Sequence, residues 1–219
     1  MLSSVLCLNS INKADAQTSV KIGQQEWMIN NLNVSKFKNG DTVPEARTND
    51  EWIKAGAEFK PAWCYYNNDP KNDVKYGKLY NIYAVIDPRG LAPVGWHISS
   101  DKEWDKLIEY VAEHFLGVTA SVERIMENFP NPLGKFMKSK EGWQDNKNGG
   151  NESGFTALPG GGRYSKGEFK YMGNKGNWWN SRQAYSLDAW RPDLYDHYPR
   201  VFGDDYNEGH GFSVRCIKD

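Results

Sequence analysis

The sequence has no long hydrophobic run, no block of basic residues and only three cysteines among its 219 residues. A membrane-spanning helix needs roughly 20 consecutive apolar residues, so we expect no integral membrane segment. The 27 basic residues nearly balance the 28 acidic ones and are spread along the chain, which disfavours a nucleic-acid partner. Because the chain is long enough to bury a sizeable core, its stability is not expected to depend on disulfides or on a metal.

Motifs of several enzyme and metal-site classes are also lacking. The four histidines show neither H-x-x-x-H nor H-E-x-x-H spacing, so a zinc site is not expected. No nucleophile elbow and no Ser-His-Asp order stands out. The Gly-Gly-Gly run at residues 160–162 lacks the features of a phosphate-binding loop and predicts a backbone reversal instead. These patterns favour a protein that is not an enzyme and has no cofactor.

Aromatic residues are abundant, with nine Trp, twelve Tyr and nine Phe, and they accompany 21 Gly and 10 Pro. Disordered chains are poor in aromatics, so this composition predicts a globular protein with a small core and many loops. The length fits one domain preceded by a leader. We therefore expect residues 17–219 to form a single domain.

Residues 1–16 resemble a leader more than a structural element. Residues 1–11 are mildly apolar, and Ala14-Asp15-Ala16 is an A-x-A cleavage pattern ahead of Gln17. The apolar stretch is short and no basic residue precedes it, and a start codon assigned too far downstream would explain both features. A frayed cytoplasmic tail is the alternative. We expect an exported protein that is extracellular, periplasmic or on the cell surface.

Hydrophobic spacing and turn residues predict an α+β domain with short helices in the N-terminal half. Thr48-x-x-Glu51 and Ser100-x-x-Glu103 are capping boxes, and the helices they open should end at Gly56 and Gly117. A weaker helix is expected within residues 118–129. Strands are predicted around a reversal at Gly23, and then at residues 62–66, 154–158, 169–172, 178–181, 184–187 and 211–217, which makes the C-terminal half mainly antiparallel and loop-rich.

Seven strings of the sequence occur in the order found in one known family. They are Q-E-W-M at 25–28, N-N-L-N at 30–33, C-Y-Y-N-N at 64–68, Y-G-K-L-Y at 76–80, A-P-V-G-W-H-I at 92–98, G-F-x-A-L-P-G-G at 154–161 and G-F-S-V-R-C at 211–216. In these strings the chain resembles the Fibrobacter succinogenes major paralogous domain, over nearly all of residues 17–219. Trp27, Trp96, Phe155 and Phe212 inside these strings, and Trp104 in the E-W pair at 103–104 that continues the series, are expected to pack the framework. His97 is expected to be a hydrogen-bonded structural imidazole.

The resemblance implies a C-type lectin-like fold, of the kind shared by formylglycine-generating enzymes and retroelement-diversified binding proteins. In those binders the segment before the final G-F-S-V-R strand displays variable side chains on a fixed scaffold. Sugar-binding C-type lectins use E-P-N and W-N-D calcium ligands, which this chain lacks, so calcium-dependent sugar binding is not implied. An acidic cluster at 204–208 has enough oxygen ligands for calcium, but we favour a solvated loop there.

Cysteine usage leaves two alternatives. If the leader is removed, Cys64 and Cys216 remain, and an exported domain allows one disulfide between them or two buried free thiols. Many members of the resembled family carry Cys where this chain has Ala92. The resemblance therefore leaves Cys64 as the only partner in residues 17–219 for Cys216, which makes this pair the disulfide candidate beside the alternative of two free thiols.

Residues 178–210 combine aromatic side chains with Arg, Asp and Asn, the types that dominate recognition surfaces. Trp178 and Trp179 are expected in the core, and core packing is the alternative for the rest of the segment. Because Pro192, Pro199 and Gly203 interrupt strand alternation, a ligand-binding surface is predicted at Trp190, Arg191, Asp193, Tyr195, Tyr198, Arg200, Tyr206, Asn207 and His210.

The sequence thus favours a secreted or cell-surface binding module whose partner is a glycan or a protein. An enzyme on the same scaffold, either a thiol-dependent oxidase or a hydrolase, is the alternative. A structural component of the cell surface is a third interpretation.

Overall fold

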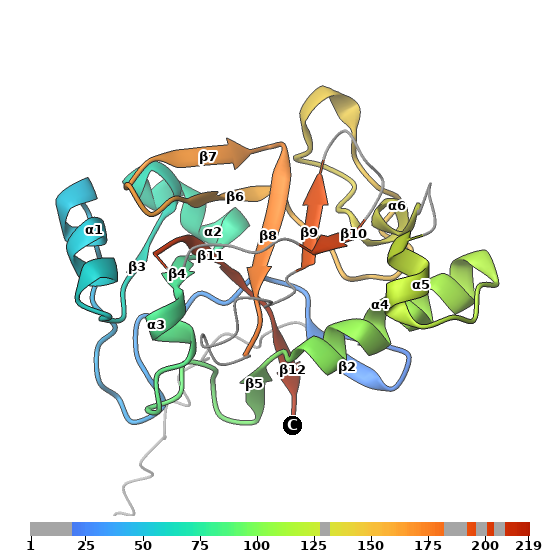
Figure 1. The fold of residues 1–219 in the computed structure, drawn as a ribbon, viewed down its shortest axis with the longest axis horizontal. Coiled ribbons are helices and arrows are strands. Elements are labelled where there is room, and N and C mark those ends of the chain that lie inside the picture. Colours follow the sequence, from blue (N-terminus) through green and yellow to red (C-terminus); the bar gives the residue numbers. More distant parts are fainter. Residues whose placement is uncertain (1–18, 128–131, 182–191, 196–200, 204–208) are drawn as a thin grey trace, which may run out of the picture.

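The computed structural model describes residues 19–127, 132–181, 192–195, 201–203 and 209–219. Within these ranges the chain is a mixed α and β structure. In Figure 1 the helices α1 (Asn49–Ala57) and α3 (Ile82–Val85) lie on one side of the strands. The helices α4 (Asp101–Leu116), α5 (Val122–Glu127) and α6 (Leu133–Met137) lie on the opposite side. The predicted leader, residues 1–16, lies outside the described residues.

The strands are short and belong to two sheets. They are β1 (Ser19–Ile22), β2 (Gln25–Met28), β3 (Trp63–Cys64), β4 (Leu79–Asn81), β5 (Trp96–Ile98), β6 (Gly160–Arg163), β7 (Phe169–Met172), β8 (Lys175–Trp179), β9 (Pro192–Tyr195), β10 (Val201–Gly203), β11 (Gly211–Val214) and β12 (Cys216–Lys218). One sheet has the order β1-β2-β12-β5, and the other has the order β10-β9-β8-β6-β11-β4-β3 with β7 paired to β6. Most pairs are antiparallel, but β8 runs parallel to both β6 and β11.

The helices follow the local signals of the sequence. They are α1 (Asn49–Ala57), α2 (Asp73–Tyr76), α3 (Ile82–Val85), α4 (Asp101–Leu116), α5 (Val122–Glu127) and α6 (Leu133–Met137), with 3₁₀ turns at Tyr66–Asn68, Pro70–Asn72 and Gln144–Asn146. Both predicted capping boxes are present, and Gly117 ends α4 in the left-handed conformation with φ 66°. The prediction of both helix starts from the capping boxes is therefore confirmed.

The core beneath α4 is built from aromatic rings, as the framework strings predict. Trp27 of β2 lies 5.1 Å from Trp104 of α4 and 5.6 Å from Phe155, measured between ring centroids. Phe155 lies 6.0 Å from Trp178 of β8 in an edge-on arrangement. All four side chains are buried, so α4, β2 and β8 are joined through one cluster. Trp96 is only partly buried and packs against a second cluster.

Two expectations for the second half of the chain are wrong. Residues 160–162 form the buried strand β6 rather than a reversal, because β6 lies among β7, β8 and β11 at close range. A Cβ on Gly161, whose φ is +62°, would lie 2.5 Å from the main-chain oxygen of Lys170. Residues 154–158 form a loop with one isolated bridge, between Ala157 and Lys138, instead of a strand.

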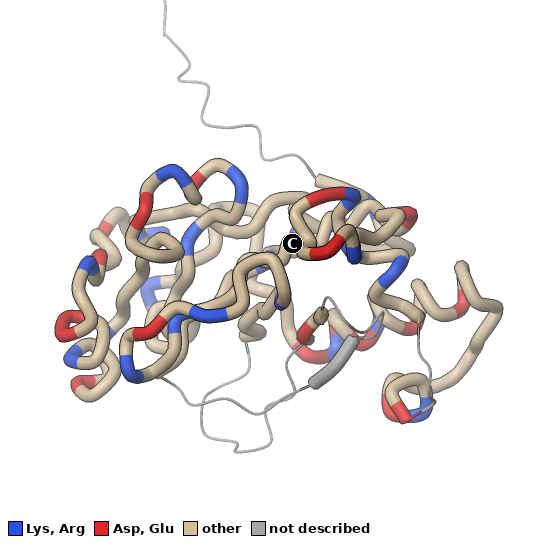
Figure 2. Tube along the Cα trace, turned by 90° about the horizontal axis from the view of Figure 1, so that it is seen from above, with Lys and Arg blue, Asp and Glu red and all other residues tan. Residues whose placement is uncertain are grey.

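Acidic and basic residues are both scattered over the described chain, as the trace in Figure 2 shows. None of the described helices is both long and apolar enough to span a bilayer.

Candidate functional site

The predicted recognition segment starts and ends on two neighbouring buried strands. Strand β8 precedes it and β11 follows it, and the two pair in parallel through Ser213 with Trp178 and Val214 with Trp179. Both tryptophans are buried as predicted. The indole N–H of Trp178 donates to Asn31 Oδ1 at 2.9 Å, and that of Trp179 donates to the main-chain oxygen of Tyr80 at 2.7 Å. Trp178 and Trp179, at the start of the segment, are therefore held in place by packing and hydrogen bonds.

Three of the nine predicted ligand-binding residues fall within the described residues. They are Asp193 and Tyr195 on β9, and His210 just before β11. The other six lie outside the described residues, namely Trp190, Arg191, Tyr198, Arg200, Tyr206 and Asn207. The acidic cluster at 204–208 also lies outside them.

Asp193 is a buried residue that pairs with β8 and does not lie on an exposed face. Its Oδ2 is 2.8 Å from Lys175 Nζ on β8, and the two side chains are only 1% and 2% exposed. A buried charge is retained in a protein when it is paired, so this contact explains why both residues can be inside. The burial of Asp193 argues against a direct ligand contact.

Tyr195 lies between two buried lysines. Lys175 Nζ is 4.3 Å from the centroid of its ring, which is half-buried, and Lys138 Nζ donates to its main-chain oxygen. Lys138 in turn lies 4.4 Å from the ring centroid of Trp143. Strand β9 is thus held to β8 and to the chain after α6 by cation–π contacts and hydrogen bonds.

His210 is buried, and its ring lies 4.6 Å from the ring of Tyr164, which follows β6. The ring of Tyr171 on β7 lies edge-on to the ring of Tyr164, with 5.9 Å between the centroids. Lys170 Nζ lies 5.2 Å from the centroid of the Tyr164 ring. Tyr171 is 50% exposed. These neighbours could not be predicted, because regular strand alternation would place Tyr171 on the same face as Phe169.

The candidate disulfide is not formed, and both Cys64 and Cys216 are buried free thiols. Cys64 belongs to the cluster around Trp52 and Leu79, whereas Cys216 belongs to another cluster, which also contains Ala92. An even number of cysteines permits a disulfide but does not place the two side chains together. Burial raises the pKa of each thiol to about 12.

Thiol titration should therefore distinguish native from denatured protein. A thiol with a pKa of about 12 is roughly 10⁻⁴ ionised at pH 8, so neither Cys64 nor Cys216 should react in the native chain. After denaturation without reductant, residues 17–219 should show two reactive thiols. If these thiols appear only after a reductant is added, the free-thiol structure is contradicted.

His97 is a hydrogen-bonded structural imidazole, as the sequence predicts. Its Nδ1 is 2.7 Å from Asp219 Oδ1, and its Nε2 is 2.7 Å from Glu103 Oε1. Burial lowers the pKa of His97, but the two carboxylate contacts outweigh it, and the net pKa is raised. Glu103 also accepts from the backbone N–H of Ser100 in the capping box, so His97 links the start of α4 to the end of β12.

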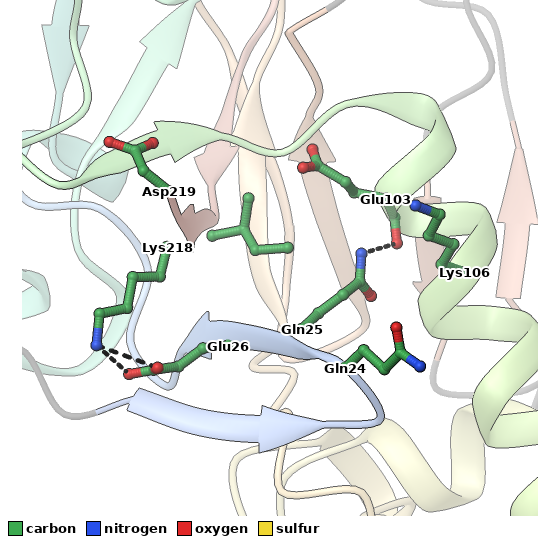
Figure 3. Close-up of a pocket in the computed structure, with 8 residues that line it drawn as sticks. Gln24, Gln25, Glu26, Glu103, Lys106, Lys218 and Asp219 are labelled. Atoms are coloured by element: carbon green, nitrogen blue, oxygen red, sulfur yellow. Dashed lines mark hydrogen bonds and ion pairs between the residues drawn. The ribbon is translucent and has the colours of Figure 1, made fainter.

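A polar cleft of about 320 Å³ lies between the β1–β2 hairpin, α4 and β12 (Figure 3). Lys218 Nζ pairs with Glu26 Oε1 at 3.0 Å on one side of it. On the other side Gln25 Nε2 donates to the main-chain oxygen of Glu103, also at 3.0 Å. Because these groups satisfy one another and carry both signs of charge, the cleft favours neither an anionic nor a cationic ligand.

Acidic residues gather along the outer part of α4. Burial, together with the negative charges of Asp101 and Glu109, raises the pKa of Asp105 to about 6. A cleft of about 440 Å³ lies beside Glu109 and Glu113. Within the part of the chain that the structure describes, no three His, Cys, Asp or Glu side chains are placed to hold a metal ion.

Comparison with known proteins identifies the domain. No curated protein sequence matches the chain, and no solved structure matches its fold. A sequence profile of the Fibrobacter succinogenes major domain matches residues 20–218, from β1 to the end of β12. The match covers the motifs quoted above and both sheets, and the chain therefore belongs to the Fibrobacter succinogenes major domain family.

Proposed function

We propose that the chain is an exported ligand-binding module with a C-type lectin-like fold, and that residues 190–210 recognise a glycan or a protein. The leader-like residues 1–16 support export. The observation that carries the binding proposal is the pairing of β8 with β11, which places the strand that precedes these residues beside the strand that follows them. This arrangement suits a variable segment displayed on a fixed scaffold.

Rigid support matters because ordering a mobile surface on binding costs affinity. Strand β9 is fixed by the ion pair between Asp193 and Lys175, and the end of the segment is fixed by His210 against Tyr164. The segment itself is rich in Trp, Tyr and Arg, the residue types that carry most binding energy in protein interfaces. These features support recognition rather than catalysis.

The test is an array of glycans and proteins probed with residues 17–219. Hits on the unmodified chain should weaken by roughly tenfold or more in the double variant Trp190→Ala/Tyr206→Ala, since truncating two aromatic anchors removes hot-spot contacts. The control is Val74→Ala/Val94→Ala, which alters two side chains that are 95% and 86% exposed and lie outside the segment.

Melting temperatures of all three proteins establish that the variants are folded. Hits that survive Trp190→Ala/Tyr206→Ala at full strength would remove the site from residues 190–210. The two buried thiols, with their raised pKa values, give no support to a thiol-dependent enzyme on this scaffold.

A further inference from the structure

The alternation of side chains breaks in β7, at Tyr171. In a regular strand Phe169 and Tyr171 would face one side, with Lys170 and Met172 on the other. Instead, Phe169 and Met172 both pack against the cluster around Trp52, while Lys170 and Tyr171 are both exposed. The cause is the left-handed conformation of Tyr171, with φ 69°.

A left-handed tyrosine is costly, and the core does not require one. Packing Met172 inwards needs only a left-handed residue at position 171, which glycine provides without strain. Tyr171 keeps a ring there that is 50% exposed and so gains limited burial in return. Packing therefore explains the left-handed backbone at position 171 but not the tyrosine that occupies it, and such retained strain motivates a functional hypothesis where recognition groups lie beside it.

The exposed ring is accompanied by polar groups from the same hairpin. We define the hairpin patch as Tyr164, Glu168, Lys170 and Tyr171. Tyr164 lies edge-on to Tyr171 at 5.9 Å, and Lys170 Nζ lies 5.2 Å from the Tyr164 ring. Lys170 Nζ also pairs with Glu168 Oε1 at 3.1 Å. The patch therefore combines an aromatic surface with hydroxyl, ammonium and carboxylate groups, and its two charges cancel.

We propose that the hairpin patch binds one sugar ring of a neutral glycan, with the ring stacked on Tyr171. A pyranose has an apolar C–H face and a rim of hydroxyls, so it can cover an aromatic ring while Lys170 donates hydrogen bonds to its edge. A stable protein interface buries about 800 Å² on each partner, far more than one ring with its polar neighbours offers. Because Lys170 is already paired with Glu168, a charged sugar has no advantage. This inference rests on the proposed binding function and assigns its ligand class.

The experiment compares variants of residues 17–219 on immobilised neutral oligosaccharides of glucose, mannose, galactose and xylose, followed by calorimetry with the best soluble one. Tyr171→Gly removes the ring and also relieves the left-handed strain, so its melting temperature should not fall. Its affinity should drop by roughly tenfold or more. Tyr171→Phe keeps the stacking ring and should bind within about threefold of the unmodified chain.

The matched control is Phe59→Gly, because Phe59 is another exposed left-handed aromatic, with φ 56° and 70% exposure, far from β7 in sequence. It should leave binding unchanged. Tyr171→Asn is a second ring-free variant, since Asn also tolerates left-handed backbone, and it should lose binding as Tyr171→Gly does.

Full binding by Tyr171→Gly or by Tyr171→Asn overturns the proposal, as does the absence of binding to every oligosaccharide. Loss in Tyr171→Gly with full binding by Trp190→Ala/Tyr206→Ala supports the hairpin patch and rejects residues 190–210 as the site. The reverse pattern rejects the hairpin patch and leaves the proposed function intact.

Discussion

Replacing Lys175 by methionine should lower the free energy of unfolding by roughly 3–5 kcal/mol, because it leaves the Asp193 carboxylate buried without its cation. The two groups are 2.8 Å apart, and their side chains are almost completely buried. Lys175 also contacts the ring of Tyr195, so the substitution removes a second contact on β9. Urea denaturation followed by tryptophan fluorescence measures the loss.

A double substitution tests whether stability depends on the two charges or on the volume that the two side chains fill. Lys175→Met/Asp193→Leu replaces both charges with apolar groups and should recover most of the lost stability, as buried ion pairs often allow. Lys218→Met is the matched control, since Lys218 forms an exposed pair with Glu26 and such pairs contribute little. If Lys175→Met and Lys218→Met lower the free energy of unfolding equally, the buried Lys175–Asp193 pair contributes no more to stability than an exposed pair.

Replacing Arg215 by methionine should cost about 3 kcal/mol or more, because several buried acceptors lose their donor at once. Arg215 is fully buried and donates to the main-chain oxygens of Met28 and Phe155 and to Asn31 Oδ1, at 2.7–3.0 Å. Its guanidinium lies 4.4 Å from the Phe155 ring. Burial lowers the pKa of Arg215 to about 9, which still leaves it charged at neutral pH.

Arg215→Lys tests whether charge alone is sufficient. Lysine keeps the charge but cannot reproduce the planar fork of donors, so most of the loss should persist. Arg89→Met is the control, because Arg89 is partly exposed and pairs with Asp87 and Asp41 at the surface. A loss below about 1 kcal/mol for Arg215→Met would mean that water replaces the missing donors.

Features set by local chemistry could be predicted from the sequence. The capping boxes at Thr48 and Ser100, the left-handed Gly117 and the turn at Gly23 each depend on a few neighbouring residues. The aromatic core could also be predicted, because large rings in framework strings have few alternatives to burial. The family followed from the order of those strings.

Features that depend on contacts between distant residues could not be predicted. Nothing near Asp193 in the sequence indicates that Lys175 would be its buried partner, since β8 and β9 meet only in the folded sheet. The two free thiols belong to different clusters, which a count of cysteines cannot show. The left-handed conformation of Tyr171 lets Met172, and not Tyr171, pack against the cluster around Trp52. The sequence does not show which of these two neighbouring side chains packs inwards.

The continuous run β11–β12 serves both sheets, with β11 beside β4, β6 and β8 and β12 beside β2 and β5. Arg215 lies at the junction between the two strands. Both strands follow their partner strands in the sequence, so neither sheet is complete until residues 211–218 have been made. Pairing between strands so far apart in the sequence slows folding. The edge of β2 that pairs with β12 therefore stays open until residues 216–218 have been made.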